Sequence, residues 1–524
     1  MTILPIKKLF NTHFFYTIII ILFSFSINFY YSKLGVFPID TFLHYDSAYR
    51  ILENEIPFRD YWIVSGLVVD VIQSIFFKLF GTNWFAYILH SSIFNCLVAL
   101  FTYFFLIELK LNKFKATFYT FSFAILAYTI SGTPFVDHHA AFFLLIATFL
   151  IIKNLKLQRN YLWVLIVFLF FLSFLSKQVP VTYASLLYSV ILFYYLIKKK
   201  EINRIFVILS SIFIIIIVFL IILKIVGIDL KIFFIQYIDF PRSIGSSRLE
   251  YLDITVNSLF NHYKFLIFPI IIIIWMKFRK INLKKKISFS EENVSLMILL
   301  ALAFSLIFHQ IMSKNQIFIY FLIPIFFGYL DSTFNESKEN SKKFISIFLI
   351  IFLTFITLKY HFRYNEPRKF HELATVNLGD AIKANLMHES LNSLSWINPL
   401  FKGNANDEIS ILRIAKKRFD NLKKNEVMLI THYQFLQSIT KKKLNYPNRT
   451  YTTDGVSMPS RNNKHYKSYK NYLINKIKKE KISEIYFFKH ESISNKVVTD
   501  YIDKKCYSIK EDEIFLIFEL KCFQ

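Results

Sequence analysis

Residues that crosslink or interrupt a chain are scarce in this sequence of 524 residues, which has 3 cysteines, 10 glycines and 12 prolines. So few cysteines exclude a small disulfide-stapled scaffold. So little glycine and proline exclude collagen-like and low-complexity architectures. The sequence also lacks the paired, Gly/Pro-interrupted apolar segments that many transporters use at their binding sites.

Acidic residues are also scarce, since 36 Asp and Glu stand against 62 Lys and Arg, for a formal net charge of +26. The hydrophobic fraction is nevertheless 55%, and long apolar runs recur along the chain. This pattern predicts a polytopic α-helical membrane protein and excludes a soluble enzyme or a fibrous protein. Because membrane proteins concentrate Lys and Arg in cytoplasmic loops, we expect no nucleic-acid partner.

Hydropathy predicts about eleven transmembrane helices, several of them shorter than the ~20 residues that a straight span needs. The predicted spans are 13–31, 84–107, 116–131, 139–152, 161–176, 179–197, 205–226, 259–276, 293–312, 315–330 and 344–360.

Basic residues occur in alternate short loops, which predicts the orientation. The basic loops hold Lys110, Lys113 and Lys115; Lys153, Lys156 and Arg159; Lys198–Lys200 and Arg204; Arg279, Lys280 and Lys284–Lys286; and Lys338, Lys342 and Lys343. We therefore expect a multi-pass protein of the cell (inner) membrane with a cytoplasmic N-terminus and an extracytoplasmic C-terminal region.

Two regions outside the spans are predicted to fold. Within a transmembrane domain of residues 1–361, the first outer loop, 32–83, has amphipathic spacing typical of interfacial helices at 41–53 and 64–80, and another outer loop covers 227–258. Residues 362–524 predict an extracytoplasmic α/β domain. Its expected elements are strands at 427–431, 484–488 and 514–520 and helices at 408–423 and 466–480. In that domain Cys506 and Cys522 either form a disulfide, as an oxidising compartment permits, or remain two thiols.

Two predicted outer loops carry carboxylates near the membrane surface. Asp40 follows the first span, where it either accepts a proton from an acceptor hydroxyl or caps the helix that starts near Thr41. Asp137 begins the fourth predicted span, as a helix N-cap or as a second acidic group of the same site. Asp137, His138 and His139 are also metal-ligand types, so a divalent metal is a further hypothesis.

Cations and polar groups lie in the other predicted outer loops. Lys177, between two apolar spans, either reaches the interface with its side chain or meets an anion such as phosphate. Arg242 and Arg248 either bind phosphate or face solvent. His309 and Gln310 predict, with His138, the lining of a cavity.

At the first outer loop the sequence resembles the GT-C glycosyltransferases, in particular the bacterial protein-mannosyltransferase and aminoarabinose-transferase type. The resemblance rests on Asp40 after the first span, Ala-Tyr-Arg-Ile-Leu at 48–52 and Pro-Phe-Arg-Asp-Tyr at 57–61. Asp137 is similar to the second outer acidic residue of that family, and Phe-Leu-Ser-Lys-Gln at 174–178 to its Leu-Thr-Lys segment. The family commonly has Glu after the first acidic residue, where this chain has Thr41, so Asp46 is an alternative to Asp40.

The resemblance implies transfer of a sugar from a polyprenyl-phosphate carrier to a glycan, lipid or protein acceptor on the outer face. Asp40, Asp46 or Asp137 would then act as the catalytic carboxylate, and Lys177, Arg242 or Arg248 would bind the donor phosphate. One base and no covalent intermediate favour inversion. No cofactor is implied with certainty, and a divalent metal is an open expectation.

Three other functions fit part of the pattern. A transporter or flippase of lipid-linked glycans predicts a charged pathway at the centre of the membrane. A polysaccharide polymerase or ligase would rely on Arg242 and Arg248 and not on Asp40. A non-catalytic scaffold would use the C-terminal domain to bind a partner.

Overall fold

The computed structural model of the chain describes residues 13–249, 255–280, 290–313, 316–335, 339–422, 426–452 and 455–523. Of the basic loop residues, Lys284–Lys286 and Lys338 lie outside these ranges. The chain folds into two compact units. Unit 1 is Met1–Ser32, Ser91–Ile217 and Tyr251–Phe370, and unit 2 is Lys33–His90, Val218–Glu250 and His371–Gln524.

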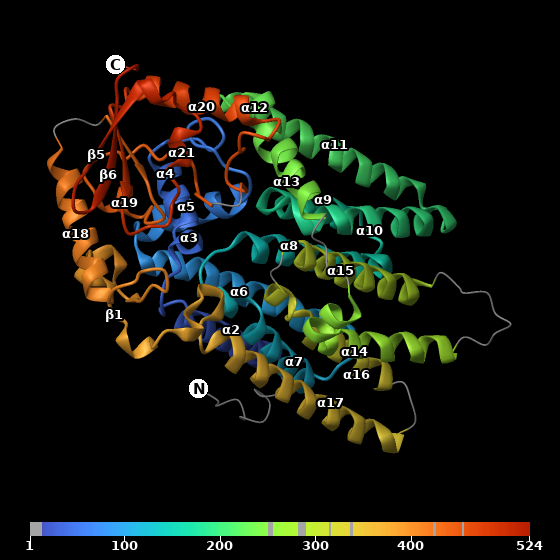
Figure 1. Cartoon of the computed structure of the whole chain (residues 1–524). Helices are drawn as coiled ribbons and strands as arrows, with labels where there is room; N and C mark the ends of the chain where they lie inside the picture. Colours follow the sequence, from blue (N-terminus) through green and yellow to red (C-terminus); the bar gives the residue numbers. More distant parts are fainter. Residues whose placement is uncertain are drawn as a thin grey trace, which may run out of the picture. The chain divides into compact units, whose positions relative to one another are not determined.

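Eight helices in the described part of the chain are apolar and long enough to cross a membrane. They are α2 (His13–Tyr31), α6 (Trp84–Glu108), α8 (Val136–Leu157), α10 (Gln178–Lys198), α11 (Ile202–Ile225), α14 (Val256–Lys280), α15 (Glu291–Ser313) and α17 (Glu339–Tyr360) (Figure 1). The other three predicted spans form shorter helices, namely α7 (Lys113–Leu126), α9 (Asn160–Ser176) and α16 (Leu322–Asn335). The prediction of a helical membrane-type protein is therefore confirmed, whereas eleven full spans are not.

The apolar helices differ in how much of their surface other helices cover. In α8, 78% of the most apolar window is buried, and the helix packs against α9, α10 and α15. In α11 only 6% of that window is buried, although its mean hydropathy of 3.5 is the highest of the eight. An exposed, wholly apolar helix is unfavourable in water and favourable in lipid, so α11 is typical of a membrane-embedded protein.

Unit 2 contains helices from the predicted first outer loop and a small sheet from the C-terminal region. The loop forms α3 (Pro38–Thr41), α4 (Leu43–Leu52) and α5 (Leu67–Phe80), and α4 packs on α5. The four-stranded sheet has the order β3-β4-β6-β5, in which only β3 and β4 are parallel. Its strands are β3 (Val427–Ile430), β4 (Glu484–Phe488), β5 (Tyr507–Glu511) and β6 (Phe515–Leu520), and the two longer helices of the region are α18 (Ala405–Asn421) and α20 (Tyr466–Lys479).

Most of these elements match the sequence expectation, and β5 was missed. Strands β3 and β4 are largely buried and read as short apolar runs. β5 lies at the edge of the sheet, and its side chains are half-buried or exposed. A strand with no buried face lacks the apolar alternation by which strands are recognised.

The C-terminal region packs with two segments that precede it by hundreds of residues. The backbone N–H of Trp62 donates to the carbonyl of Pro447 (2.9 Å), and the N–H of Arg449 donates to the carbonyl of Trp62 (3.1 Å). The side chain of Gln236 donates to the carbonyl of Phe58 (2.8 Å) and accepts from the N–H of Ile63 (3.0 Å). The side chain of Asn463 donates to the Ser243 hydroxyl (2.9 Å), so both predicted outer loops contact the C-terminal region as well as one another within unit 2.

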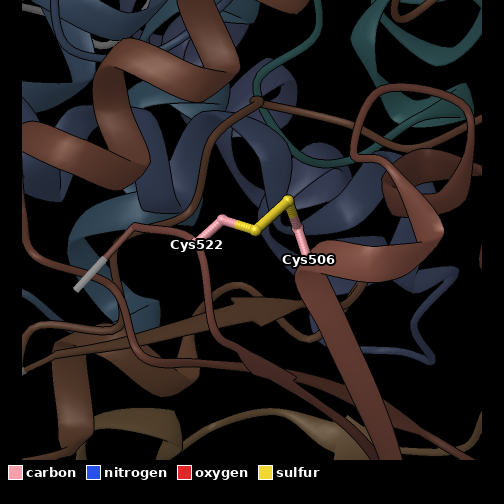
Figure 2. Close-up of a disulfide and its surroundings, with 2 residues drawn as sticks. All are labelled: Cys506 and Cys522. Carbon is pink, nitrogen blue, oxygen red and sulfur yellow. A yellow bond between two sulfur atoms is a disulfide. The ribbon is translucent and has the colours of Figure 1, made fainter.

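A disulfide joins Cys506 to Cys522, which decides between the two alternatives left by the sequence (Figure 2). The bridge links the start of β5 to the end of the chain after β6, over 16 residues of sequence. Cys96 is a buried free thiol.

Replacing both Cys506 and Cys522 by alanine is expected to lower the free energy of unfolding by about 3 kcal/mol, because the open chain gains conformational entropy when it unfolds. Thermal unfolding of the purified protein with and without a reductant measures the effect. The reductant should lower the melting temperature of the wild type and leave that of the double variant unchanged. Equal responses would contradict the bridge.

Candidate functional site

Three ionisable side chains from separate parts of the chain meet in unit 1 and form what we call the α8 cluster, namely Asp137, Lys177 and His309. The Lys177 Nζ donates to both carboxylate oxygens of Asp137 at 2.8 Å. The His309 Nε2 lies 2.9 Å from the Asp137 Oδ1. The sequence predicted all three residues as site residues, and the structure brings them together.

The ends of apolar helices position this cluster. Asp137 lies in the first turn of α8, where the helix dipole favours a negative charge. Lys177 is the residue between α9 and α10, and His309 is in the last part of α15. The N-cap of α8 is Phe135, so the interpretation of Asp137 as an N-cap is wrong.

In the α8 cluster, the buried Asp137 carboxylate holds the partly exposed Lys177 ammonium in place. The Asp137 side chain is 5% exposed, whereas that of Lys177 is 22% exposed. An ammonium has three N–H donors, and two of them point to Asp137. A held, partly exposed ammonium at the end of apolar helices is suited to an anionic group such as a phosphate.

The two histidines that follow Asp137 point to other partners. The His138 Nδ1 lies 3.0 Å from the Ser131 Oγ, and the His139 Nδ1 lies 2.8 Å from the Tyr128 hydroxyl. His138 is fully buried among aromatic rings. Asp137, His138 and His139 thus do not share a metal site, and no group of three or more His, Cys, Asp or Glu suited to a metal occurs within the described ranges.

Gln310, the other residue predicted to line a cavity, is buried beside His309 in α15. Its side-chain oxygen is a buried acceptor without a hydrogen-bond partner among the described atoms. A polar group in this state is costly unless it meets a donor.

Asp40 is half-buried in unit 2, within the single turn of α3. The N-cap of the following helix, α4, is Phe42, so the interpretation of Asp40 as that cap is wrong. Its partial exposure is compatible with contact to a substrate.

Asp46 lies instead inside a buried ionic group around Arg50. Its carboxylate is 1% exposed and lies 3.7 Å from an Arg50 guanidinium nitrogen, beyond hydrogen-bond distance. Arg50 donates to Glu55 at 2.6–2.8 Å and to the carbonyl of Tyr446 at 2.9 Å. Its guanidinium also stacks 3.8 Å above the ring of Tyr61. Full burial makes Asp46 a poorer candidate than Asp40 for contact with a substrate.

The same burial controls the ionisation of these carboxylates. Burial raises the pKa of Asp46 to about 8, although Arg50 acts to lower it. Burial also favours the neutral form of Glu55, but Arg50, Lys476 and Lys443 outweigh it and lower the pKa of Glu55. Arg50 therefore helps to lower the pKa of Glu55 below its usual value, whereas it does not offset the effect of burial on the pKa of Asp46.

A second buried ionic group surrounds Asp70 of α5. The Asp70 Oδ1 is 2.5 Å from the His44 Nδ1, and its Oδ2 accepts from Arg449 at 3.2 Å. Burial raises the pKa of Asp70 to about 7, against the influence of Arg449. Burial and Arg449 lower the pKa of His44 well below its usual range, so the histidine is neutral.

The Asp46→Asn variant tests the ionisation of Asp46. An acid whose pKa is raised in the folded state contributes stability at low pH, below its unfolded pKa of ~4. That contribution is lost as the pH rises through about 8. The stability of the wild type relative to Asp46→Asn should therefore fall between pH 5 and pH 8, by on the order of 1 kcal/mol per pH unit. Denaturant unfolding of both proteins at several pH values measures the difference, and a difference that is constant or grows with pH would contradict the assignment.

The two predicted phosphate-binding arginines lie on α13 (Phe240–Leu249) in unit 2. Arg242 is exposed and Arg248 is half-buried. Neither belongs to the α8 cluster or to the buried group around Arg50.

The sequence predicted Asp46 as a site residue, but it did not single out the other buried ionic residues of unit 2. Arg50 follows Asp46 by four positions, a helical ion-pair spacing that was a usable signal. Asp70 in an apolar helix was a second signal. Arg449 is 379 residues from its partner Asp70 and had none.

Comparison with models of protein families gave no match for this chain, and comparison with curated proteins gave none either. Assignment of a function therefore depends on the residues described above.

Proposed function

We propose that the protein is a membrane glycosyltransferase that moves a sugar from a polyprenyl-phosphate carrier to an acceptor on the outer face of the cytoplasmic membrane. The observation that carries the proposal is the α8 cluster. It fixes the Lys177 ammonium by a buried carboxylate at the ends of apolar helices, where the phosphate of a membrane-anchored donor would lie. Ionisable groups in such helices mark functional sites by default.

The orientation in the proposal follows from loop charge. With the eleven apolar helices taken as spans, the basic loops fall on one side, which the positive-inside rule makes cytoplasmic. The α8 cluster and the segments of unit 2 then belong to the outer side. The Cys506–Cys522 disulfide supports this placement, since disulfides persist outside the reducing cytosol.

Lys177 would act on the leaving group. In the transfer, the acceptor oxygen attacks the anomeric carbon, the bond from that carbon to the phosphate oxygen breaks, and the carrier leaves as polyprenyl phosphate. Negative charge grows on the phosphate as the bond breaks, and an ammonium already in place stabilises it without reorganisation. Asp137 is the positioning residue that keeps the Lys177 side chain in place.

Removal of the acceptor proton needs a base, and the resemblance to the GT-C enzymes implies Asp40. Its half-buried position agrees with this role better than the full burial of Asp46 does. A single displacement by this route inverts the anomeric configuration.

The test is reconstitution of the purified protein in liposomes with polyprenyl phosphates that carry radiolabelled hexoses or pentoses, and with glycan, glycolipid and peptide acceptors. The proposal predicts label in an acceptor and release of polyprenyl phosphate from at least one donor. Flux of the intact donor across the liposome membrane without cleavage would instead support a transporter. Elongation of a diphosphate-linked glycan would support a polymerase or ligase.

A further inference from the structure

A pocket of about 530 Å³ opens in unit 2, between the α12 segment (Leu230–Phe234), helix α20 and the loop around Asp60. Its volume falls within the range typical of small-molecule sites. Its lining includes Arg59, Trp62, Lys231, Tyr472, Lys476 and Lys479. None of them belongs to the α8 cluster.

The carboxylates that line the pocket already have partners. Asp60 accepts from Arg59 (2.7 Å), Lys479 (3.1 Å) and the backbone N–H of Ile56 (2.9 Å). These donors outweigh burial and hold the pKa of Asp60 well below its usual range. Glu480 pairs with Lys443 at 3.3 Å. Asp229, the third carboxylate of the lining, accepts from the backbone N–H of Ile232 at 2.9 Å. The lining therefore has four cations, Arg59, Lys231, Lys476 and Lys479, against three carboxylates.

Lys476 is a buried cation of the lining without a counter-charge in contact. The residue is 5% exposed, and its Nζ donates to the backbone carbonyl of Asp60 at 2.6 Å. In the part of the chain that the structure describes, no carboxylate lies within ion-pair distance of this nitrogen. A buried ammonium is costly without an anionic partner.

Burial and the nearby cations also disfavour the protonated form of Lys476. Burial lowers its pKa to about 7, and Arg50 and Lys443 act in the same direction. Glu55 and Glu480 oppose this effect without overcoming it. An anion in the pocket would favour the protonated amine and remove the imbalance.

Aromatic and amide side chains also line the pocket. Trp62 and Tyr472 line it, with ring centroids 5.7 Å apart. The Trp62 Nε1 is buried and has no hydrogen-bond partner among the described atoms. Asn471 and Asn475 add exposed amides from the same helix, α20. Flat apolar rings beside amides suit the C–H faces and hydroxyls of a sugar.

We propose that this pocket binds a monosaccharide unit that carries a negative charge, either a carboxylate or a phosphate. The charged group meets Lys476, with Lys231, Lys479 and Arg59 around it, and the ring lies against the half-buried Tyr472, which packs beside the buried Trp62. This inference does not rest on the proposed function, because it uses none of the residues assigned to the transfer.

Calorimetric titration of the full-length protein in detergent tests the proposal with four probes: glucuronate, glucose 6-phosphate, glucose and inorganic phosphate. We expect glucuronate or glucose 6-phosphate to bind at least ten times more tightly than both glucose and inorganic phosphate, and the tighter of the two identifies the source of the charge. Inorganic phosphate binding as tightly as either anionic sugar would overturn the sugar site. An equal or weaker affinity of both anionic sugars compared with glucose would overturn the charge recognition.

Variants assign the binding to the pocket. Lys476→Met should weaken binding of the preferred probe at least tenfold, and Lys231→Ala, an exposed position that leaves folding intact, about threefold. Lys467→Met, on α20 but outside the lining, is the matched control and should bind as the wild type does. Wild-type affinity in both pocket variants would overturn the proposal. Asp137→Asn should also keep wild-type affinity, which separates this test from that of the transferase.

Discussion

Replacing Arg50 by methionine is expected to lower the free energy of unfolding by about 3–5 kcal/mol. Arg50 is fully buried and is the common partner of Asp46 and Glu55, which are 1% and 7% exposed. Without the guanidinium, the buried Glu55 keeps Lys443 (3.4 Å) as its cation partner, and the buried Asp46 loses its ion pair with Arg50. The loss should appear as a lower melting temperature and a lower denaturant midpoint.

The control for this variant is Arg461→Met, which removes an ion pair with Asp500 in the same unit. The Arg461 side chain is 63% exposed, so its removal should cost less than about 1 kcal/mol. The double variant Arg50→Met/Glu55→Gln should recover part of the loss, because it removes the buried charge of Glu55 that Arg50 had paired. Equal stability of Arg50→Met and Arg461→Met would show that the buried group does not hold unit 2 together.

Replacing Lys177 by methionine is expected to lower kcat for sugar transfer about 100-fold or more, while the protein remains folded. Removing one preorganised donor to a developing charge has effects of about that size in other active sites. The transition state carries more negative charge on the phosphate than the bound donor does, so kcat should fall more than KM changes. Initial rates of polyprenyl phosphate release over a range of donor concentrations separate the two parameters.

Lys115→Met is the matched control for Lys177→Met. Lys115 also pairs with a buried aspartate of unit 1, Asp331 at 3.3 Å, and its side chain is 18% exposed. Asp331 keeps hydrogen bonds from Tyr119 and Ser346 when the lysine is removed. This pair involves the first residues of α7, in a predicted cytoplasmic loop, so its loss should leave transfer near the wild-type rate. A similar loss of activity in both variants would contradict a specific role for Lys177.

The sequence predicted the helices well because apolar periodicity is a local property. All eleven predicted spans are helices, and α4, α5, α18 and α20 lie close to their expected positions. Helix α9 matches its predicted span, whereas α7 ends at Leu126 and α16 begins at Leu322, because short 3-10 turns at Tyr128–Ile130 and Gln316–Ile319 occupy part of those two predicted spans. Strand β5 was missed because it has no buried face.

The partners within the candidate site were harder to predict than its members. Lys177 was expected to meet either the interface or a phosphate, and its contact is Asp137, 40 residues earlier. His309 joins them from 172 residues further along. Such pairings depend on how α8, α9, α10 and α15 pack, which no local pattern contains. The burial of Asp46 depends likewise on Arg50, Glu55 and Tyr446.

The most direct test of the proposed glycosyl transfer measures transferred sugar and released polyprenyl phosphate together in one reconstituted reaction, for the wild type, Lys177→Met and Asp40→Asn. The proposed displacement predicts one polyprenyl phosphate released for each sugar transferred, an inverted anomeric configuration in the product, and loss of both signals in the two variants. Transfer at the wild-type rate in both variants, or transfer without release of polyprenyl phosphate, would contradict it.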